Sequence, residues 1–372
     1  MIENPRVDQI LPSFGYYDAI GTDNRTIREL IRSKGLESDI FAEEGVMQGE
    51  CRHLSEYAPY ASKGNLLIHH FSVGSLVPYY LMGAASSKIT RYHNITPSKF
   101  FPFPHTSCAK SKCKQGREQF PLIRDLSDYY WAASAYNANE LDDYGFRNGS
   151  VLPLMRNYKK LLEIEPCKKM TEFLQRDKRK TILFVGRVVP NKAHHDLLFL
   201  LKQYYEYVGN DVRLVCVGRM DPYYGGVLVK KLAVEWGLRT SFEKPFGIHS
   251  DVIFTGAVND HELASFYQHA DVFTCMSDHE GFCVPLVEAM NFKIPILAHK
   301  AAAVPETLGN GGLLVDKNDP VETLNGLIKI LNDHKEIEKY SLLSYNRAKN
   351  FDWENLKNQF SDHLDSVLND LN

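Results

Sequence analysis

Short runs of apolar and β-branched residues alternate with longer amphipathic stretches along almost the whole chain. Runs of about four to eight such residues predict buried strands, and the stretches between them predict helices. In the first half, strands are predicted over residues 7–14, 64–72, 87–95 and 126–134. In the second half, they are predicted over residues 180–188, 212–220, 250–258, 270–277 and 293–300. This alternation predicts parallel sheets covered by helices.

The stretches between the strands have the polar ends that helices need. The first predicted helix, residues 22–35, ends at Gly35. Its start carries three polar residues that can cap a helix: Thr22, Asp23 and Asn24. Further helices are predicted over residues 136–144, 193–209, 260–270 and 285–292, and the last stretch, 351–371, is amphipathic.

The length of the chain and the restart of the pattern predict two domains. A chain of 372 residues is too long for one ordinary core. The segment 159–180 is highly charged and has little strand character, so it is the candidate linker. The predicted fold class is α/β, with two doubly wound, Rossmann-like parallel-sheet domains facing across a cleft. We expect an N-terminal domain over residues 1–165 and a C-terminal domain over residues 178–350.

The composition excludes several classes of protein. A hydrophobic content of 44% and a charged content of 24% are ordinary for a globular protein, and a net charge of −3 gives no reason to expect nucleic acid as a partner. The N-terminus has no basic segment followed by an apolar run, and no run of about eighteen apolar residues occurs. We therefore expect a cytoplasmic protein, or at most one held at the inner face of the cytoplasmic membrane.

The cysteines indicate reduced thiols. There are seven, an odd number, and most are scattered, which argues against a disulfide framework. His105, Cys108 and Cys113 lie close enough in sequence to suggest metal ligands, but a fourth ligand at the spacing of a zinc finger is missing. Ordinary thiols in a loop are the favoured interpretation, and no metal is expected.

The loop GRVVPNK after the first strand of the second half carries two cations, Arg187 and Lys192. A helix N-terminus follows this loop, so a diphosphate there would meet a guanidinium, an ammonium and backbone N–H groups together. The alternative is that both side chains are simply solvated. Neither a P-loop nor a G-x-G-x-x-G dinucleotide fingerprint is present, which disfavours a nicotinamide-dependent dehydrogenase.

The stretch SDHEGFCVPLVEAM, residues 277–290, places two carboxylates around a turn that leads into a helix. Glu280 lies in the predicted loop, and Glu288 lies one turn into the predicted helix. Gly281 permits close approach of the backbone to a ligand, and the N–H groups around Phe282 and Cys283 point out of the helix start. Carboxylates can accept hydrogen bonds from the vicinal hydroxyls of two sugars. Alternatively, Glu288 stabilises the helix N-terminus and Glu280 is a surface residue.

Together these motifs resemble a known family. Glu280 and Glu288 with GFCVP between them, preceded by GRVVPNK and followed by AVPETLGNGGLLVD, look like the retaining nucleotide-sugar glycosyltransferases of family 4, which have the GT-B fold. The resemblance extends to FGYYDAIGTDNRTIRELIRSKG, HHFSVGS, KITRYHNITP and WAASAYNANEL in the N-terminal half. It implies that the terminal helix, 351–372, packs back on the N-terminal domain.

The resemblance also implies roles for single residues of the donor site. Glu280 resembles the glutamate that holds the hydroxyls of the donor sugar, and Glu288 the one that holds the ribose. Arg187 and Lys192 match the pair that neutralises the diphosphate. The residues that match backbone groups facing the donor are Gly186, Gly281, Phe282 and Cys283. Arg219–Met220 and Gly256–Val258 follow neighbouring strands, so Arg219 and Val258 are expected to line the base pocket.

Two further residues are placed by the resemblance in the N-terminal half. His93 looks like the histidine that lines the reaction centre from the acceptor side, although a histidine at a strand end is often only a local hydrogen-bond partner. Gly21 matches the glycine loop that closes over the diphosphate. The family's paired glycines are replaced here by AIGTDN, in which Thr22 or Asp23 is a candidate for acceptor binding.

The acceptor side offers one more candidate feature. The segment 99–124 mixes aromatic and basic residues, namely Phe100, Phe101, Phe103, Lys110, Lys112, Lys114 and Arg117. Such a segment could contact an anionic membrane surface or a polyprenyl-diphosphate sugar. An ordinary solvated helix over apolar residues is the slightly favoured alternative.

The function implied is that of a retaining, metal-independent glycosyltransferase without a cofactor. It would move a mannose- or glucose-type hexose from a UDP- or GDP-sugar to a glycan or lipid-linked acceptor, in the assembly of cell-surface polysaccharide. The expected catalytic residues are Arg187, Lys192, Glu280 and His93. The alternatives are a phosphorylase, for which no dedicated pyridoxal phosphate lysine is marked, and a non-catalytic sugar-nucleotide-binding or scaffold protein.

Overall fold

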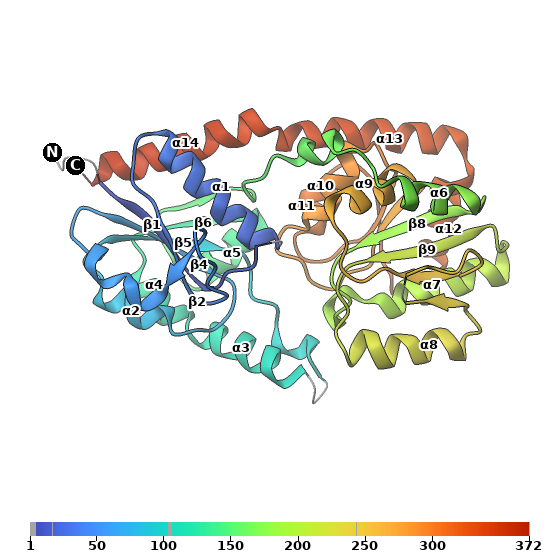
Figure 1. The fold of residues 1–372 in the computed structure, drawn as a ribbon, viewed down its shortest axis with the longest axis horizontal. Helices are drawn as coiled ribbons and strands as arrows, with labels where there is room; N and C mark the ends of the chain where they lie inside the picture. Colours follow the sequence, from blue (N-terminus) through green and yellow to red (C-terminus); the bar gives the residue numbers. More distant parts are fainter. Residues whose placement is uncertain (1–4, 17, 103–105, 243, 372) are drawn as a thin grey trace. The chain divides into compact units, whose positions relative to one another are not determined.

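The computed structural model describes residues 5–16, 18–102, 106–242 and 244–371. The chain forms two compact units (Figure 1). Unit 1 consists of Met1–Asn157 together with Asp352–Asn372, and unit 2 consists of Tyr158–Phe351. Within its described residues each unit has a seven-stranded parallel sheet, which confirms the predicted α/β class with two doubly wound sheets.

The sheet of unit 1 has the strand order β3-β2-β1-β4-β5-β6-β7. Its strands are β1 Val7–Ser13, β2 Ile40–Glu44, β3 Arg52–His53, β4 Leu66–Phe71, β5 Ser87–Tyr92, β6 Tyr129–Ala132 and β7 Gly149–Val151. Its helices are α1 Ala19–Ser33, α2 Val77–Gly83, α3 Ser107–Glu118, α4 Phe120–Leu126, α5 Ala135–Asp143 and α14 Trp353–Asp370, with 3₁₀ turns η1 Leu54–Glu56, η2 Ala58–Tyr60 and η3 Ser98–Phe100.

The central strands of unit 1 are buried on both faces. Every residue of β4 and all but the last residue of β1 are buried, as expected for parallel strands covered by helices on both sides. An aromatic cluster fills the space under α4, where the Phe120 ring lies 5.1 Å from that of Phe71 and 5.5 Å from that of Tyr92. This core holds the carboxyl ends of β4 and β5 in fixed positions.

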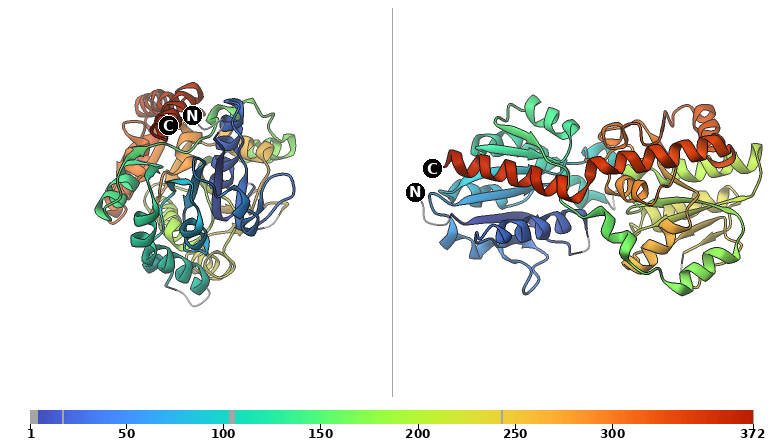
Figure 2. Two further views of the ribbon diagram at one scale, coloured as in Figure 1. Left: turned by 90° about the vertical axis from the view of Figure 1, so that its left-hand side faces the viewer. Right: turned by 90° about the horizontal axis from the view of Figure 1, so that it is seen from above.

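Helix α14 completes unit 1 although it is the last element of the chain. Figure 2 shows it, at the red end of the colour scale, lying against the strands of this unit. The Phe360 ring packs edge-on against Trp131 at 5.8 Å, and the Gln359 side chain donates to the carbonyl of Val151 at 2.9 Å. The buried residues of the helix are Leu356, Phe360, Leu364 and Val367. These recur at the helical period, so one apolar stripe faces the sheet.

The sheet of unit 2 has the strand order β10-β11-β9-β8-β12-β13-β14. Its strands are β8 Lys180–Val185, β9 Val212–Val217, β10 Thr240–Ser241, β11 Val252–Phe254, β12 Val272–Cys275, β13 Ile296–His299 and β14 Leu313–Val315. Its α-helices are α6 Lys168–Arg176, α7 His194–Tyr207, α8 Lys230–Glu235, α9 Asp260–Gln268, α10 Val284–Asn291, α11 Val304–Leu308, α12 Pro320–Asn332 and α13 His334–Ala348. Its shorter turns are η5 Tyr158–Glu163, η6 Pro190–Lys192, the π-helical Tyr224–Val229 and η8 Lys349–Phe351.

Both sheets contain a point at which the strand order reverses. In unit 1 it lies between β1 and β4, and in unit 2 between β8 and β12. The loops that leave two such neighbouring strands run to opposite faces of the sheet, so a crevice opens between them at the carboxyl ends. These two points are therefore the places to look for ligand-binding residues.

The first helix begins earlier than the sequence predicts. Asp18 is its N-cap, because its carboxylate accepts a hydrogen bond from the N–H of Gly21 at 2.6 Å. The predicted loop AIGTDN is thus the first part of α1, and the prediction that Gly21 lies in a loop before the helix is wrong. A Cβ on Gly21 would lie 1.8 Å from the carbonyl oxygen of Gly15, so this position has no room for a side chain.

The candidate linker 159–180 is built into unit 2 rather than joining the units. Its α6 packs through the buried Met170 and Leu174, and the buried Arg213 donates to the Leu174 carbonyl at 2.9 Å. The N–H of Cys167 donates to the carbonyl of His261, at the start of α9, at 3.0 Å. A charged segment can therefore be structural when its charges alternate with apolar residues at the helical period.

Candidate active site

The predicted donor-site motifs of unit 2 lie at its reversal point. The GRVVPNK loop leaves β8 and the loop containing Glu280 leaves β12, which are neighbouring strands. Hydrogen bonds join the two loops, since the N–H of Asp278 donates to the Asn191 carbonyl at 2.9 Å and the Asn191 side chain donates to the His279 carbonyl at 3.2 Å. The loops form one structure, although 88 positions separate Asn191 from His279.

Glycines bring the loops after β8 and β9 into contact. A Cβ on Gly218 would lie 2.1 Å from the carbonyl oxygen of Gly186. The N–H of Gly186 donates to the Val217 carbonyl at 2.8 Å, and the N–H of Val188 donates to the Arg219 carbonyl at 3.0 Å. The ladder between β8 and β9 thus continues into the loops and fixes the backbone from which Arg187 projects.

The two cations of the β8 loop differ in their surroundings. The Arg187 side chain is exposed and pairs with none of the residues that the structure describes. The Lys192 ammonium lies 2.5 Å from a Glu280 carboxylate oxygen, and these two side chains are only 19% and 10% exposed. Burial lowers the pKa of Lys192, but the Glu280 charge outweighs this and raises the pKa above its usual value. Lys192 is therefore a cation held at the site by a carboxylate.

The turn between Glu280 and α10 exposes backbone donors at the helix start. Cys283, the N-cap residue, has a φ of 70°, which turns the chain sharply into α10. The Phe282 carbonyl accepts a hydrogen bond from Thr307 at 2.6 Å, and the Phe282 ring packs 5.5 Å from Phe351. The N–H groups of Phe282 and Cys283 donate to none of the described residues. Such a helix start favours an anion.

The second glutamate of the motif is held inside the unit. Glu288 lies on α10, is 3% exposed, and accepts a hydrogen bond from the Tyr267 hydroxyl at 2.7 Å. The Tyr267 ring stacks at 5.2 Å on that of Phe292, which follows α10. The orientation of the Glu288 carboxylate is therefore set by packing and by this hydrogen bond.

The predicted base-pocket residues follow the two strands on the other side of β8. Arg219 is exposed and follows β9, while Val258 is half-buried between β11 and α9. The N–H of Gly218 donates to the Gly256 carbonyl at 3.0 Å, which joins these two loops. Arg219 and Val258 thus lie at the same edge of the sheet as Lys192 and Glu280.

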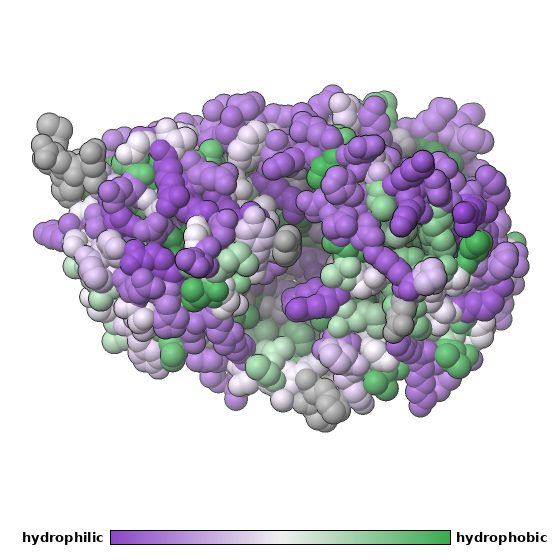
Figure 3. Space-filling model, in the orientation of Figure 1, coloured by the Kyte–Doolittle hydropathy of each residue, from purple (hydrophilic) through white to green (hydrophobic). Residues whose placement is uncertain are grey.

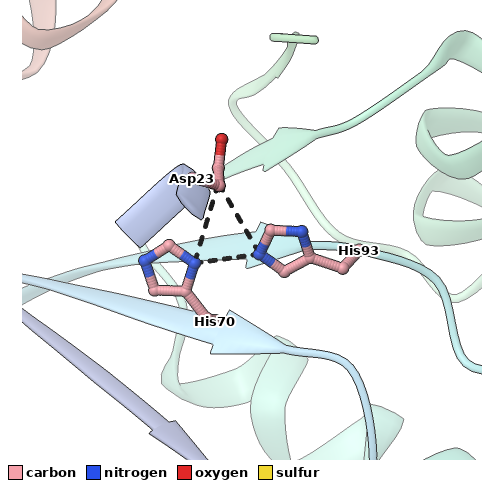
Figure 4. Close-up of side chains that lie close together, drawn as sticks. All are labelled: Asp23, His70 and His93. Carbon is pink, nitrogen blue, oxygen red and sulfur yellow. Dashed lines mark hydrogen bonds and ion pairs between the residues drawn. The ribbon is translucent and has the colours of Figure 1, made fainter. Parts of the chain in front are cut away.

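His93 belongs to a buried polar cluster in unit 1, at the reversal point of that sheet. It directly follows β5, and its Nε2 lies 2.9 Å from Nδ1 of His70 on β4 and 3.8 Å from the carboxylate of Asp23 on α1 (Figure 4). Arg91 donates two hydrogen bonds of 3.1 Å to that carboxylate. Burial and the Arg91 charge hold the pKa of His93 well below its usual value. His93 is therefore neutral.

Two groups of side chains have the composition of metal ligands. The ligand atoms of Asp23, His70 and His93 lie within 4.8 Å of one another. The second group is formed by Glu280 and two thiols, Cys275 and Cys283, whose sulfur atoms are 3.9 Å apart. The contact with Cys275 and burial both raise the pKa of Cys283, so this thiol stays protonated at neutral pH.

Comparison with known proteins places this site in a family. Residues 168–349 match the family described as "Glycosyl transferases group 1". These residues belong to the group 1 glycosyltransferases. The match spans unit 2 from α6 to the end of α13, and so includes both motifs of the candidate donor site.

Individual relatives match this chain over parts of their length. The chain is 32% identical over 106 residues to the O-antigen chain mannosyltransferase B of Escherichia coli, covering 28% of each protein. It is 30% identical over 189 residues to the MMP alpha-(1->4)-mannosyltransferase of Mycolicibacterium hassiacum, covering 50% of this chain and 42% of that protein. The matches thus span less than half the length of these relatives.

Solved structures match over nearly the whole chain. The sucrose-phosphate synthase of Thermosynechococcus elongatus superposes with a TM-score of 0.72 at 16% identity, covering 97% of this chain and 99% of that one. Anabaena HepE, in a complex with UDP-glucose, superposes with a TM-score of 0.69 at 16% identity and the same coverage. The chain has the GT-B fold, as predicted.

Several residues at the candidate site were not predicted from the sequence. Lys317 donates to Asp278 and to Asp196, at 2.6 Å each, and so ties β14 to the Glu280 loop and α7. Asn191 joins the loops after β8 and β12. Its position within the GRVVPNK motif is the one feature of the sequence that points to a role for it. In unit 1, His70 stands in HHFSVGS, a stretch that carried part of the resemblance but no assigned role.

The aromatic-basic segment 99–124 forms α3 and α4 in unit 1. Lys112 pairs with Glu44 at 3.0 Å, and Arg117 pairs with Glu140 at 2.9 Å, while Phe101 is buried. Phe103 and His105 lie outside the described residues. Part of the basic charge is thus used inside the unit, which favours the ordinary helix over a membrane contact.

In the part of the chain that the structure describes, no helix combines the length and the apolar content needed to cross a bilayer. Hydrophilic residues cover most of the face shown in Figure 3.

Proposed function

We propose that this protein is a retaining, metal-independent glycosyltransferase that moves a hexose from a nucleoside diphosphate sugar to a glycan or lipid-linked acceptor. The observation that carries the proposal is the Lys192–Glu280 pair, set beside free backbone donors where the sheet order of unit 2 reverses. An ammonium and a helix start suit a diphosphate, and a carboxylate suits the hydroxyls of a sugar. One site thus offers complementary groups for both parts of the donor.

The leaving group would be stabilised by fixed positive charge. When the bond between the anomeric carbon and the β-phosphate oxygen breaks, negative charge develops on that phosphate. In this proposal, that charge is received by Arg187, Lys192 and the N–H groups at the start of α10. Each preorganised donor of this kind is worth about 3–4 kcal/mol of the barrier, or roughly 10²–10³ in rate. These donors supply the charge that a divalent cation supplies in other enzymes, and for this reason we propose that no metal is needed.

The sugar would keep its anomeric configuration through attack on the same face as the leaving group. The acceptor oxygen forms the new bond to the anomeric carbon, and its proton passes to the departing phosphate oxygen, so that charge and atoms balance. In this scheme Glu280 positions the sugar and Glu288, oriented by Tyr267, holds the ribose. A covalent glycosyl adduct on Glu280 would contradict the scheme.

The names of related proteins support a role in the biosynthesis of cell-surface polysaccharide. Besides the O-antigen mannosyltransferase, a partial match is the lipopolysaccharide 1,2-N-acetylglucosaminetransferase of Salmonella typhimurium, 27% identical over 195 residues. Seven free cysteines agree with a reducing compartment, so we place the activity in the cytoplasm, where it could meet a lipid-linked acceptor at the inner membrane face. UDP and GDP are the candidate nucleotides.

The competing function is a sugar-nucleotide-binding or scaffold protein without catalysis. Such a protein has no need to keep both cations and both glutamates, and this chain retains Arg187, Lys192, Glu280 and Glu288. Binding alone does not separate the two functions, so transfer to an acceptor must be measured.

The test begins with thermal unfolding in the presence of UDP, GDP, ADP and their hexose conjugates, with and without EDTA. A ligand at about a hundred times its Kd stabilises the folded protein by about 2.7 kcal/mol. We expect one nucleotide to stabilise the wild type equally with EDTA, and Lys192→Ala to lose most of the shift. Transfer from that donor is then followed with glycan and lipid-linked acceptors, and NMR reports the anomeric configuration. Binding without transfer to any acceptor would favour the scaffold, and an inverted product would refute retention.

A further inference from the structure

A chain of buried hydrogen bonds crosses the reversal point of unit 1 and ends at His93. Gln9 lies on β1, His70 on the neighbouring β4, and His93 directly after β5. Nε2 of His70 lies 2.9 Å from Oε1 of Gln9, and Nδ1 of His70 lies 2.9 Å from Nε2 of His93. Gln9 and His70 are fully buried. Neither side chain is among the residues to which the family resemblance assigns a role.

The direction of each hydrogen bond between Gln9, His70 and His93 follows from one backbone carbonyl. The Gln9 side-chain nitrogen donates to the carbonyl of Asn24 at 3.0 Å, so Oε1 of Gln9 must be the acceptor toward His70. His70 therefore carries its proton on Nε2, and in the neutral ring Nδ1 is an acceptor. Nε2 of His93 must then donate to it, which leaves Nδ1 of His93 without a proton.

Both rings are held in the neutral form by their surroundings. Burial lowers the pKa of His70 well below its usual value, and so does the neighbouring His93. For His93 the same effect comes from burial, from Arg91 and from His69. The nearby carboxylate of Asp23 does not reverse this, because Arg91 donates two hydrogen bonds to it and the N–H of Met155 donates a third at 2.5 Å.

This row of hydrogen bonds leaves one acceptor, Nδ1 of His93, without a partner among the described residues. Nδ1 of His93 is buried and accepts no hydrogen bond from any residue that the structure describes. A buried lone pair in this state is satisfied when a ligand brings a donor. Figure 4 shows that this nitrogen lies on the side of the ring turned away from His70 and Asp23.

We propose that Gln9 and His70 are positioning residues that fix His93 as the Nε2–H tautomer, so that its Nδ1 accepts a hydrogen bond from a hydroxyl of the sugar substrate. The substrate part of this inference rests on the proposed function, whereas the tautomer part depends only on unit 1. A metal ion bound to His70, His93 and Asp23 is the competing interpretation. It would require Nε2 of His93 to lose its proton and would place a cation beside the Arg91 guanidinium.

The direct test is NMR of the full chain labelled with ¹⁵N-histidine. Two-bond ¹H–¹⁵N correlations distinguish the tautomers, and the His70→Ala and His93→Ala variants assign the signals. We expect both rings as neutral Nε2–H tautomers, unchanged from about pH 8 to pH 5.5 and unchanged by Zn²⁺. An Nδ1–H tautomer or an imidazolium at His93 would overturn the inference. A Zn²⁺-dependent shift of both rings would support the metal site instead.

Variants of Gln9 test how the tautomer is held. With its buried carboxyl protonated, Gln9→Glu keeps both the acceptor for Nε2 of His70 and the donor to the Asn24 carbonyl, whereas Gln9→Leu removes both. We expect the His93 signals to be retained in the first and to become a mixture of tautomers in the second. The matched control is His69→Leu, because His69 is the neighbouring buried histidine on β4 and takes no part in the chain. If Gln9→Leu does not fold, the wild-type spectrum alone decides the tautomer.

Activity separates the inference from the proposed function. Once a donor and an acceptor are known, we expect Gln9→Leu to lower kcat/KM about tenfold and Gln9→Glu to restore it. The predicted spectrum without transfer from any donor would refute the proposed function and leave the tautomer assignment standing. Transfer with unchanged kcat/KM in Gln9→Leu would refute the positioning role alone.

Discussion

The ion pair between Lys192 and Glu280 predicts that two conservative substitutions change nucleotide affinity in opposite directions. The Lys192 ammonium lies 2.5 Å from Glu280, so a diphosphate must share this cation with a carboxylate. Glu280→Gln keeps the shape and removes the competing negative charge. We expect it to bind UDP or GDP, which carry no sugar, more tightly than the wild type, whereas Lys192→Met binds them more weakly.

The magnitude follows from the exposure of the pair. A hydrogen bond to a charged group is worth about 1.5–3 kcal/mol, which corresponds to roughly a 10- to 150-fold change in Kd. Because the Lys192 and Glu280 side chains are 19% and 10% exposed, water screens part of this energy. We therefore expect a change of about tenfold for Glu280→Gln, and of about tenfold or more in the opposite direction for Lys192→Met.

The assay is isothermal titration of each variant with the nucleoside diphosphate that binds the wild type, at one fixed ionic strength. Lys231→Met is the matched control, because Lys231 is an exposed lysine of the same unit whose one ion-pair partner among the described residues is Glu235, at 3.7 Å. It should leave Kd unchanged. Weaker nucleotide binding by Glu280→Gln, or unchanged binding by Lys192→Met, would refute the reasoning. Turnover with the full sugar donor should fall in both variants, since each loses a group proposed to contact that donor.

Three further predictions concern the framework of the site. Arg91→Met leaves the buried Asp23 carboxylate without its guanidinium partner and should cost about 3–5 kcal/mol of unfolding free energy in urea denaturation. The double variant with Asp23→Leu should recover most of this cost, and equal costs for both variants would contradict the prediction. Gly218→Ala places a methyl 2.1 Å from the Gly186 carbonyl oxygen and should weaken nucleotide binding by displacing the Arg187 loop. If calorimetric titration gives this variant the nucleotide Kd of the wild type, the loop adjusts to the methyl and the prediction is wrong. Burial lowers the pKa of His194 to about 3, so the unfolded chain takes up a proton at this residue below about pH 6.5 and the folded protein does not. The contribution of His194 to the unfolding free energy should therefore fall by about 1.4 kcal/mol per pH unit from about pH 6.5 downward, and His194→Leu should flatten the measured slope by that amount.

The sequence identified the inner strands of both sheets and missed the outer ones. The nine predicted strands are all present, because parallel strands under two layers of helices are nearly continuous apolar runs. The missed strands are β2, β3, β7, β10 and β14, of two to five residues each. These outer segments carry no readable period, and they pair with their neighbours because the inner strands are already in place.

The candidate site was predicted best where its residues are adjacent in sequence. Glu280 and the turn to Cys283 form one local motif, so their placement followed from the order of strand, loop and helix. The Lys192–Glu280 contact joins residues that are far apart in the chain, and it could be expected only from the neighbouring positions of β8 and β12. Gly21 was misplaced because the capping role of Asp18, three residues earlier, left no periodic signal. Gln9 reads as one polar residue within an apolar strand, and nothing local reveals its partner on β4.

Unit 1 is built from two separated parts of the chain, and this has a consequence for the order of folding during synthesis. The ribosome releases residues 1–157 first, yet α14, which covers Trp131 and the edge near Val151, follows only after all of unit 2. Domains generally fold as units while the chain emerges. Unit 2, a continuous segment, can therefore fold while the earlier strands of unit 1 still expose the apolar surface that α14 will cover. Until then that surface is accessible to chaperones and to self-association. The docking of α14 is therefore the event that completes the folding of unit 1.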